Sequence, residues 1–343
     1  MSTTGSTILI DAYSQIFRVF YAIAHLSRRD GFPTNALFGF ARLLMQLEKE
    51  FTPTAGAMFF DCGKPAFRLE LAPEYKSNRP PMPEALKLQM PLLRKMAEIF
   101  GWNVCECTGY EADDLIGAAV KNSPGKQFAI ISSDKDLSQL VDEYTSMLIP
   151  SRSGSGFERR TATEVITKFG VAPDQIIDYL SMLGDSSDAI TGIPGVGPKT
   201  AASVLQSCHS LSNFFANPQL LNNIKTREKL LNAEELLQRN RQLITLRTIW
   251  PENELGSLEQ KLCKNTPDWQ QLAELAREYE LKSILREIPA SMTLTSSPAK
   301  ESTPTPEADN PEDLFSWSAA REQTQKPVED LPQADVWEQG QLF

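Results

Sequence analysis

The sequence predicts an α/β fold built on a parallel sheet, followed by a helical part and then by a tail of different composition. Apolar runs that suit buried strands recur early in the chain, and each is followed within three residues by an aspartate. Stretches of helical character separate these runs. The three runs with their aspartates are residues 7–10 with Asp11, 57–60 with Asp61, and 128–131 with Asp134.

The alternation of strands and helices determines how the predicted strands pair. Residues 36–50 and 91–100 have helical character and lie between the apolar runs. A succession of strand, helix and strand favours right-handed crossovers and therefore a parallel sheet. Because ligands bind beyond the carboxyl ends of such strands, we expect Asp11, Asp61 and Asp134 to meet at one edge of the sheet.

Composition excludes several classes of protein. The chain has 343 residues, of which 41% are hydrophobic and 23% charged, as is typical of a protein in solution. No apolar run reaches the roughly 18 residues of a membrane span, and no basic, apolar leader precedes Asp11, so we expect a cytoplasmic protein with no membrane partner. The five cysteines lack metal or redox spacing and are expected to be reduced, and His25 and His209 lie outside every motif. Zinc, thiol-redox and histidine-based chemistry therefore have little support.

Charge is distributed unevenly between the body of the chain and its last 55 residues. Residues 289–343 carry 3 Lys or Arg against 10 Asp or Glu, include 7 prolines and supply only 8 Leu, Ile, Val or Phe. Such a segment cannot bury enough apolar surface to offset its ordering entropy, so we expect a disordered acidic tail. The body, with 31 basic and 34 acidic residues, is nearly neutral. If clustered carboxylates of the body surround cations, its remaining charge is positive and suits nucleic acid.

Further carboxylates come in three tight groups, within residues 109–114, 134–136 and 185–188. Taken singly, each group is better explained by a helix cap or a solvated turn, the usual places for aspartate. On a regular helix Glu111 and Asp114 share a face while Asp113 points elsewhere, whereas in an extended segment Asp134 and Asp136 point the same way. Taken together, so many carboxylates in one cleft would be protonated unless divalent cations neutralised them. Oxygen ligands select Mg²⁺ or Mn²⁺ over zinc.

Residues 192–201 (Gly-Ile-Pro-Gly-Val-Gly-Pro-Lys-Thr-Ala) have the glycine spacing of a phosphate-binding loop. Pro198 excludes that interpretation, because Lys must follow the last glycine directly and a strand must precede the first. We expect instead a hairpin between two helices, with Lys199 and Thr200 opening the second. Backbone N–H groups at that helix start would hold a DNA phosphate without reading its sequence. A plain Gly/Pro loop is the alternative.

A basic segment follows the run that ends at Asp61. Residues 64–95 carry seven basic and three acidic residues, which on their own would suit a solvated face. Within this segment, residues 75–79 (Tyr-Lys-Ser-Asn-Arg) combine an aromatic ring with cations and follow Asp61 closely enough to overhang the same site. Stacking on Tyr75 together with basic side chains is how single-stranded nucleic acid is bound.

These motifs together resemble the 5′ nuclease (flap endonuclease-like) family, which includes the 5′-3′ exonuclease domain of bacterial DNA polymerase I and free-standing relatives. The resemblance implies an α/β fold with a PIN-like parallel-sheet nuclease core, a helical arch, a C-terminal helical subdomain with a helix-hairpin-helix (H3TH) element that binds DNA, and no polymerase. Ala12 and Asn35 stand where the family usually has glycine, and Ala189 and Thr191 replace its usual Asn and Pro. The resemblance covers residues 7–288 and rests on 10–11, 60–61, 74–79, 109–114, 133–137, 184–188 and 192–201.

The resemblance also implies roles for individual residues. Lys76 would contact the scissile phosphate at the base of the arch, with Arg79 beside it, as the catalytic pair. The hairpin would additionally hold a K⁺ ion. The DNA-binding residues would be Tyr75, Gly192, Gly195, Gly197, Lys199 and Thr200. The site for two or more Mg²⁺ or Mn²⁺ ions would comprise Asp11, Asp61, Glu111, Asp113, Asp114, Asp134, Asp136, Asp185 and Asp188.

The resulting hypothesis is a metal-dependent 5′-3′ exonuclease and structure-specific 5′ flap endonuclease on DNA with 5′ ends, flaps or primer junctions, in replication and repair. We expect a monomer with a nuclease core at 1–160, whose arch spans about 64–100, a helical DNA-binding subdomain at 161–288, and the tail at 289–343. One alternative is a catalytically silent DNA-binding scaffold of the same fold, tethered to the replication clamp, but a scaffold has no reason to hold so much clustered negative charge. Another, a small RNA-cleaving toxin-type enzyme, fails on length and on the hairpin.

Residues 339–343 (Gln-Gly-Gln-Leu-Phe) suggest a partner-binding peptide at the end of the tail. The simplest interpretation is that apolar residues happen to end a disordered segment, since the pattern is permissive. An exposed Leu-Phe pair on a flexible linker is nevertheless available to dock in a partner's pocket. The peptide resembles the one by which bacterial polymerases and repair proteins bind the sliding clamp, which implies that Gln339 contacts one subsite while Leu342 and Phe343 fill an apolar one. Residues 313–317 are a weaker second candidate.

Overall fold

The structure is a computed structural model that describes residues 5–23, 25–151 and 156–289. Residues 290–343, which include the predicted partner-binding peptide, lie outside the described residues. The strands are β1 (Thr7–Asp11), β2 (Gly56–Phe59), β3 (Asn103–Cys105), β4 (Phe128–Ile131), β5 (Thr145–Pro150), β6 (Phe157–Arg160), β7 (Gly184–Asp185) and β8 (Ile190–Thr191).

Helices precede and follow almost every strand. The α-helices are α1 (Ala12–Ala22), α2 (Asn35–Phe51), α3 (Ala66–Leu71), α4 (Glu84–Ile99), α5 (Ala112–Lys121), α6 (Ala162–Phe169), α7 (Ile176–Leu183), α8 (Pro198–Cys208), α9 (Leu211–Ala216), α10 (Ile224–Leu231), α11 (Glu234–Ile244), α12 (Glu252–Leu255), α13 (Leu258–Lys261), α14 (Trp269–Glu278) and α15 (Lys282–Glu287). The short 3₁₀ helices are η1 (Asp136–Leu140), η2 (Pro173–Gln175), η3 (Ser186–Asp188) and η4 (Pro218–Leu220).

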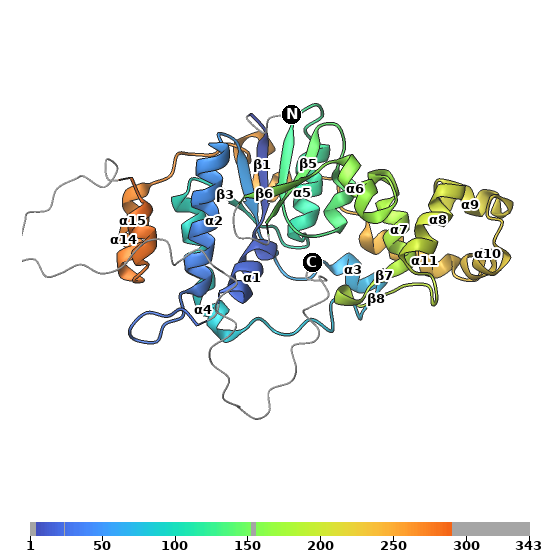
Figure 1. Cartoon of the computed structure of the whole chain (residues 1–343), viewed down its shortest axis with the longest axis horizontal. Helices are drawn as coiled ribbons and strands as arrows, with labels where there is room; N and C mark the ends of the chain where they lie inside the picture. Colours follow the sequence, from blue (N-terminus) through green and yellow to red (C-terminus); the bar gives the residue numbers. More distant parts are fainter. Residues whose placement is uncertain (1–4, 24, 152–155, 290–343) are drawn as a thin grey trace, which may run out of the picture.

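The central sheet has the strand order β3-β2-β1-β4-β5-β6 (Figure 1). From β3 to β5 all neighbours pair in parallel, so that Ile10 lies beside Met58 on one side and Ile131 on the other. The edge strand β6 runs antiparallel to β5. This topology confirms the predicted mainly parallel sheet, and it places the carboxyl ends of β2, β1 and β4 next to one another.

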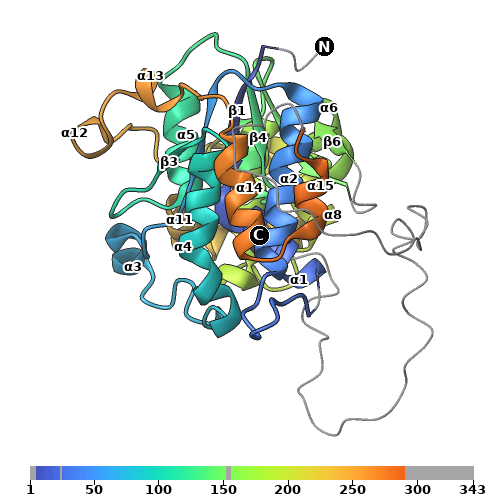
Figure 2. The same cartoon turned by 90° about the vertical axis from the view of Figure 1, so that its left-hand side faces the viewer.

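The sheet is covered on both faces, as a parallel sheet requires. Successive residues of a strand point to opposite faces. Leu9 therefore packs in a core formed with α5, α7, α8 and α11, whereas Ile8 and Ile10 pack in a second core with α1, α2, α4 and α14. Figure 2 shows α2, α4 and α14 side by side over this second face. All residues of β1, β2 and β4 are buried, which makes the strand ends a rigid platform.

Helices α6 to α11 extend the first core away from the sheet, whereas α14 and α15, which also follow β6, pack in the second core. Figure 1 shows α8, α9 and α10 at the end of the molecule remote from α14 and α15. Leu205 of α8, Phe214 of α9, Leu230 of α10 and Leu237 of α11 belong to the same buried cluster as Leu9 of β1. The helical part is therefore packed continuously onto the sheet rather than joined by a linker.

Helix α4 differs from its prediction, which placed a helix at residues 91–100. It begins at Glu84 and passes through Pro91. A proline inside a helix removes one backbone hydrogen bond and is unfavourable by itself, but burial of Leu86 and Leu93 against α2 on either side of it outweighs that loss. The segment predicted as an arch, about 64–100, therefore has two different parts. Its second half is α4, which belongs to the layer of helices that covers the sheet.

None of the helices in the described ranges combines the length and the apolar character that a membrane span requires. The five cysteines all lie within described residues and are free thiols.

Candidate active site

Asp11 marks the carboxyl edge of the sheet, because it is both the last residue of β1 and the N-cap of α1. Its Oδ1 accepts a hydrogen bond from the backbone N–H of Ser14 (3.1 Å), and its Oδ2 accepts one from Ser132 Oγ (2.8 Å). Both oxygens of this aspartate are therefore held by hydrogen bonds. As the N-cap of α1, the Asp11 side chain is fixed at the carboxyl end of β1.

Carboxylates from several elements line one small pocket at this edge. Asp61 follows β2 and accepts a hydrogen bond from the backbone N–H of Ala112 at the start of α5 (2.7 Å). Asp134 follows β4 by three residues, so the predicted meeting of Asp11, Asp61 and Asp134 is confirmed. Lys76 and Arg79 line the same pocket from the basic segment. The lining carboxylates are Asp11, Asp61, Glu111, Asp113 and Asp134.

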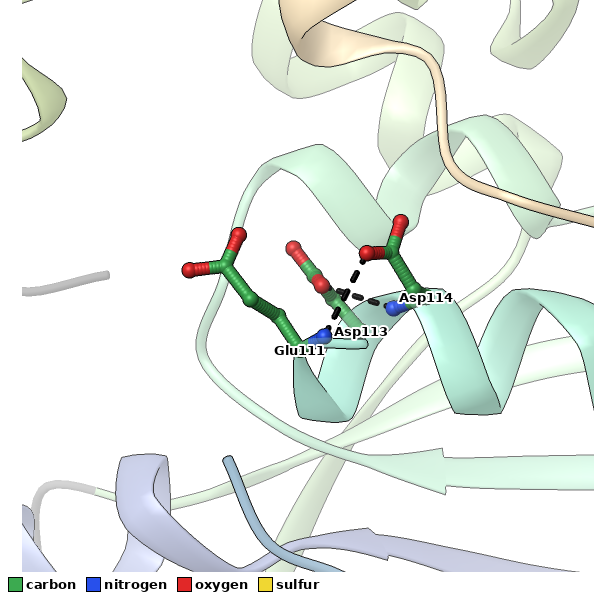
Figure 3. Close-up of side chains that lie close together, drawn as sticks. All are labelled: Glu111, Asp113 and Asp114. Atoms are coloured by element: carbon green, nitrogen blue, oxygen red, sulfur yellow. Dashed lines mark hydrogen bonds between the residues drawn. The ribbon is translucent and has the colours of Figure 1, made fainter. Parts of the chain in front are cut away.

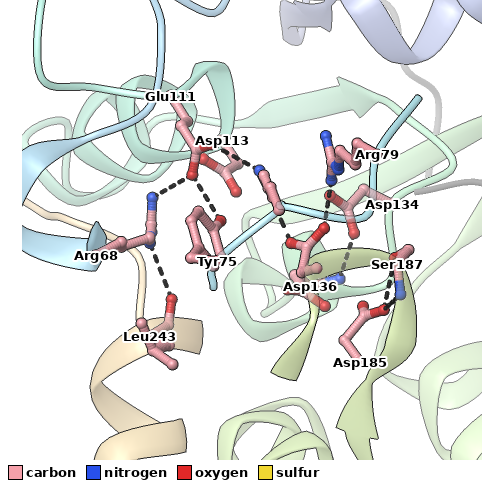
Figure 4. Close-up of polar contacts among 12 residues, drawn as sticks. Arg68, Tyr75, Arg79, Glu111, Asp113, Asp134, Asp136, Asp185, Ser187 and Leu243 are labelled. Carbon is pink, nitrogen blue, oxygen red and sulfur yellow. Dashed lines mark hydrogen bonds and ion pairs between the residues drawn. The ribbon is translucent and has the colours of Figure 1, made fainter. Parts of the chain in front are cut away.

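A second acidic group, formed by Asp134, Asp136 and Asp185, shares Asp134 with the pocket. Figure 4 shows Glu111 and Asp113 on one side, with Asp134, Asp136 and Asp185 on the other. Asp134 and Asp136 would point the same way in an extended segment, but Asp136 begins the 3₁₀ helix η1 and its N–H donates to Asp134 Oδ1 (2.9 Å). These two carboxylates therefore come together through a tight turn, not through strand alternation.

Burial raises the pKa of most of these carboxyl groups. Burial, and then the charges of Asp61 and Asp134, raise the pKa of Asp11 to about 7. Burial likewise raises the pKa of Asp61 and of Asp134. The pKa of Asp113 and that of Asp136 lie well above the ordinary value, because burial and a neighbouring aspartate act in the same direction. The cationic side chains of the site are thus too few to neutralise its carboxylates.

Asp185 has a different environment within the second group. Burial would raise its pKa, but the ammonium of Lys135, 2.8 Å from Asp185 Oδ2, outweighs burial and holds the pKa below its usual range. The other oxygen of Asp185 accepts hydrogen bonds from the backbone N–H and the hydroxyl of Ser187. Asp185 is therefore ionised and fixed in place without a metal.

The donor set fits hard divalent cations. All its ligand atoms are carboxylate oxygens, which suit Mg²⁺ or Mn²⁺ better than soft metals. Asp136 Oδ1 is buried and accepts no hydrogen bond from the described residues, and a buried oxygen of this kind calls for a partner. Oxygen atoms of Glu111, Asp113 and Asp114 lie within 4.8 Å of one another (Figure 3). The pocket and the second group could each hold a cation.

Lys76 and Arg79 bring positive charge over these carboxylates. Lys76 Nζ donates to Glu111 Oε1 (2.6 Å) and lies 3.8 Å from Asp188 Oδ2, while Arg79 pairs with Asp188. Burial alone would lower the pKa of Lys76, but the charges of Asp188 and Glu111 hold it well above the ordinary value, so this side chain remains an ammonium. Its backbone has φ +51° and is held by Asp188 O and Lys64 Nζ.

Tyr75 does not take the stacking role predicted for it. The side chain is buried, its exposed fraction being 3%, and its hydroxyl donates to Glu111 Oε2 (2.8 Å). The ring lies beneath the ammonium of Lys76, 5.0 Å from ring centroid to Nζ. No ring face is open to a base, so Tyr75 instead orients Glu111 and supports Lys76.

A row of aromatic side chains along α1 was missed by the sequence analysis. The rings of Tyr13 and Phe17 stack with centroids 6.0 Å apart, and those of Phe17 and Tyr21 with centroids 6.3 Å apart. Tyr13 lines the carboxylate pocket, and Tyr21 is 48% exposed. The sequence does contain a signal for this row: the three aromatic residues follow Asp11 at intervals of four, which places their rings on one face of a helix.

The hairpin at 192–201 joins α7 to α8 through the short ribbon β7–β8. A β-carbon on Gly192 would lie 2.0 Å from a backbone oxygen at the end of α7, and Gly195 has φ +73°, so both positions need glycine. Gly197 is the N-cap of α8, and Lys199 and Thr200 open that helix as predicted. The first N–H groups of a helix have no acceptor within it, so this end can receive an anion.

Family models match most of the chain. The model described as "5'-3' exonuclease, N-terminal resolvase-like domain" matches residues 6–170, and "5'-3' exonuclease, C-terminal SAM fold" matches residues 171–265. The chain belongs to the 5′-3′ exonuclease family. Over 282 residues it is 36% identical to a 5'-3' exonuclease of Aquifex aeolicus (strain VF5), which covers 82% of this chain and 94% of that protein. It is 35% identical to DNA polymerase I of Bacillus subtilis (strain 168) over 253 residues, which is 73% of this chain but only 29% of the polymerase.

Solved structures share the fold. The T5 D15 protein co-crystallized with metal ions has a TM-score of 0.58 at 21% identity, over 82% of this chain and 97% of that one. The catalytic core of Rad2 in complex with DNA substrate has a TM-score of 0.55 at 17% identity, over 84% and 93%. Members of the 5′-3′ exonuclease family are nucleases that hydrolyse phosphodiester bonds of DNA, and nothing in these comparisons favours the silent scaffold.

Divalent cations are expected to raise the melting temperature more at pH 8 than at pH 5. The pKa of Asp11 rises from 3.8 to about 7 on folding, so the folded state binds more protons in that window and, without metal, loses stability as the pH rises through it. At pH 8 a cation replaces these protons, and at 100 times its dissociation constant it adds about 2.7 kcal/mol. Calorimetry with Mg²⁺ or with a chelator measures the effect, and an equal gain at both pH values would contradict it.

Proposed function

We propose that this chain is a metal-dependent 5′-3′ exonuclease and structure-specific 5′ flap endonuclease, acting on DNA ends, flaps and primer junctions in replication and repair. The observation that carries the proposal is the pocket in which buried carboxylates face Lys76 and Arg79. Carboxylates of this density attract divalent cations, and the two basic side chains attract phosphate. Such a combination is suited to a phosphodiester group rather than to an uncharged substrate.

The proposed cofactors are two or more Mg²⁺ or Mn²⁺ ions. Divalent cations supply a nucleophilic water at neutral pH and stabilise charge on the attacking and leaving oxygens. Asp11, Asp61, Glu111 and Asp113 would hold one position, supported by their common pocket. Asp134, Asp136, Asp185 and Asp188 would hold the other, supported by the buried Asp136 Oδ1 that lacks a hydrogen bond among the described residues.

Lys76 and Arg79 would act on the scissile phosphate. Because its pKa lies well above the ordinary value, Lys76 cannot serve as a general base and acts instead by its charge. An ammonium held in a buried site favours the more negative transition state over the ground state. Arg79 adds a second cation on the same side of the pocket. We therefore assign both residues to stabilising charge on the phosphate.

The aromatic row on α1 and the hairpin would hold the two ends of the substrate. Tyr13, Phe17 and Tyr21 form a path from the pocket toward solvent on which unpaired bases can stack. The N-terminus of α8 would hold a duplex phosphate. The carbonyl oxygens of Pro194 and Gly195 face a cation, the ammonium of Lys229, and the proposed K⁺ ion would have to displace that ammonium or use other oxygens of the hairpin. Residues 1–160 would thus supply most of the cutting site, and 161–288 would grip the duplex and add Asp185 and Asp188 to that site.

One assay tests the proposed activity. Purified protein with Mg²⁺ is incubated with labelled flap, blunt duplex and single-stranded DNA, and product lengths are measured. We expect cleavage at or next to the junction between single and double strand, leaving 5′-phosphate and 3′-hydroxyl ends. Equal activity on RNA hairpins, or no activity on any DNA, would contradict the proposal.

Substitutions in the pocket separate the metal ligands from the phosphate-binding residues. Asp61→Asn or Asp134→Asn should reduce turnover by orders of magnitude while DNA binding survives or tightens, because an amide keeps the shape but loses the charge that holds a cation. Lys76→Ala should lower the rate more than the affinity. Single-turnover rates and DNA dissociation constants measure both. Unchanged turnover in both aspartate variants would make these side chains structural, and equal losses for Lys76→Ala would make it a general phosphate contact.

The C-terminal peptide carries a separate part of the proposal. Gln339, Leu342 and Phe343 lie outside the described residues, so their sequence alone supports docking to the bacterial sliding clamp. A monomeric nuclease tethered in this way would have a raised local concentration at primer junctions without any change at its active site. We propose that the protein acts in the cytoplasm, where cysteines stay reduced and where DNA is replicated.

Deletion of residues 339–343 tests the tether. We expect clamp binding to fall sharply while nuclease activity on free DNA stays unchanged, because the peptide is proposed to bind the clamp, whereas the pocket is lined by residues from Asp11 to Asp134. Surface plasmon resonance on immobilised clamp and the flap assay measure the two effects. Substitution within residues 313–317 is the matched control, and retained clamp binding by the truncated chain would refute the assignment.

A further inference from the structure

Asp114 lies next to Asp113 in the sequence but makes different contacts. It is fully buried, its exposed fraction being 0%. Its Oδ1 accepts hydrogen bonds from Arg68 Nη2 (2.8 Å) and from the backbone N–H of Arg247 (3.0 Å). Its Oδ2 accepts from Arg68 Nη1 (2.8 Å) and from the backbone N–H of Glu111 (3.3 Å). A carboxylate has about four acceptor positions, and these bonds occupy them.

Asp113 provides the contrast. One of its oxygens accepts a hydrogen bond from the backbone N–H of Asp114 (2.6 Å), and the side chain lines the carboxylate pocket. The oxygens of both residues lie within 4.8 Å of each other, so distance alone does not separate their roles. Figure 3 shows that Glu111 and Asp114 point to different sides of the start of α5. Hydrogen bonding therefore distinguishes a carboxylate with free acceptor positions from one without.

Arg68 is the partner that occupies Asp114. It lies on α3 with an exposed fraction of 1%, and its guanidinium also donates to Leu243 O at the end of α11 (2.9 Å) and to Glu111 Oε2 (2.6 Å). The ring of Phe67 lies 4.8 Å from the guanidinium carbon. One planar group thereby joins α3, α5 and α11, and its fork geometry is one that a lysine cannot reproduce.

Glu111 depends on these contacts for its orientation. Its Oε2 accepts from Arg68 and from the hydroxyl of Tyr75, and its Oε1 accepts from Lys76. Three donors, one on α3 and two in the segment between α3 and α4, thus set the direction in which this carboxylate faces the pocket. If Arg68 moved, Glu111 would lose the one donor that also joins it to Asp114 and α11.

We propose that Asp114 is not a metal ligand but the anchor of Arg68, and that Arg68 is a positioning residue which aims Glu111 at the metal and fastens the base of the arch to α11. This rests on the proposed function in one respect, namely that Glu111 binds a metal. It separates Asp114 from the other carboxylates that the family resemblance assigns to the metal site. The pairing of Arg68 with Asp114 does not depend on that function.

Asp113→Asn and Asp114→Asn form a matched pair that tests the pairing without metal. Urea unfolding is measured for the full chain in the presence of a chelator. Asp114→Asn should lower the unfolding midpoint markedly, because it removes the carboxylate that accepts hydrogen bonds from both Nη atoms of the buried Arg68. Asp113→Asn should leave the midpoint unchanged or raise it, because it removes a buried charge from a repulsive group. Equal midpoints, or the opposite order, would overturn the pairing.

Binding of Mn²⁺, measured by electron paramagnetic resonance without DNA, tests the positioning role. The Asp113→Asn variant should bind one Mn²⁺ ion fewer than the wild type, or bind one of the ions much more weakly. Asp114→Asn and Arg68→Lys should keep the wild-type number of ions with about tenfold weaker binding, as when a residue that supports a ligand is changed. Asp114→Asn and Arg68→Lys disturb the same contact, so the variant with both substitutions should bind Mn²⁺ no more weakly than either single variant.

Each result supports or overturns a distinct claim. Loss of an Mn²⁺ ion in Asp114→Asn, or unchanged Mn²⁺ affinity in Arg68→Lys, would overturn the proposal. If Asp114→Asn does not fold, Arg68→Lys and Asp113→Asn still give the decisive comparison. If the wild-type chain binds no Mn²⁺, the proposed function fails and Arg68 loses its positioning role, while the unfolding midpoints still decide whether Asp114 anchors Arg68.

Discussion

Mutual repulsion among buried carboxylates at the carboxyl edge of the sheet is the constraint on which the rest of the structure depends. The strands that deliver Asp11, Asp61 and Asp134 are fully buried, so these groups cannot turn away into water. Burial, and then the charges of neighbouring carboxylates, raise the pKa of each of these groups. Caps, hydroxyl donors and ion pairs oppose this rise but leave a deficit of positive charge, and a divalent cation is the group that can remove it.

The counter-charges that the protein does supply come from segments far away in the sequence. Lys76, Arg79 and Arg68 lie between β2 and β3, and Lys135 follows β4. Lys76 and a metal ion would be attracted to the same atom, Glu111 Oε1. Glu111 therefore holds the ammonium of Lys76 at the pocket and, in the proposed function, would also be one of the metal ligands.

The sequence predicted those features that depend on local pattern. Strand ends marked by aspartates and the hairpin that opens α8 follow from such patterns, because a buried parallel strand and a helix start each have a short signature. The path of α4 through Pro91, the buried position of Tyr75 and the pairing of Asp114 were not predictable in this way. Each is decided by a partner distant in sequence; Arg68, for instance, stands 46 residues from Asp114. Side-chain direction, unlike strand position, requires the tertiary structure.

The division between the two matched regions passes through the site itself. The region ending at residue 170 supplies the carboxylates from Asp11 to Asp136, whereas Asp185 and Asp188 belong to the region that begins at 171. The site is therefore complete only when the helical part packs onto the sheet, as the continuous core requires. Asp185 lies in β7, which pairs with β8, and β8 leads directly into the hairpin. Through this ribbon, the carboxylates proposed to bind metal are connected by only a few residues to the hairpin proposed to bind the duplex. A fixed distance between the two would let a nuclease cut at a junction rather than at a sequence.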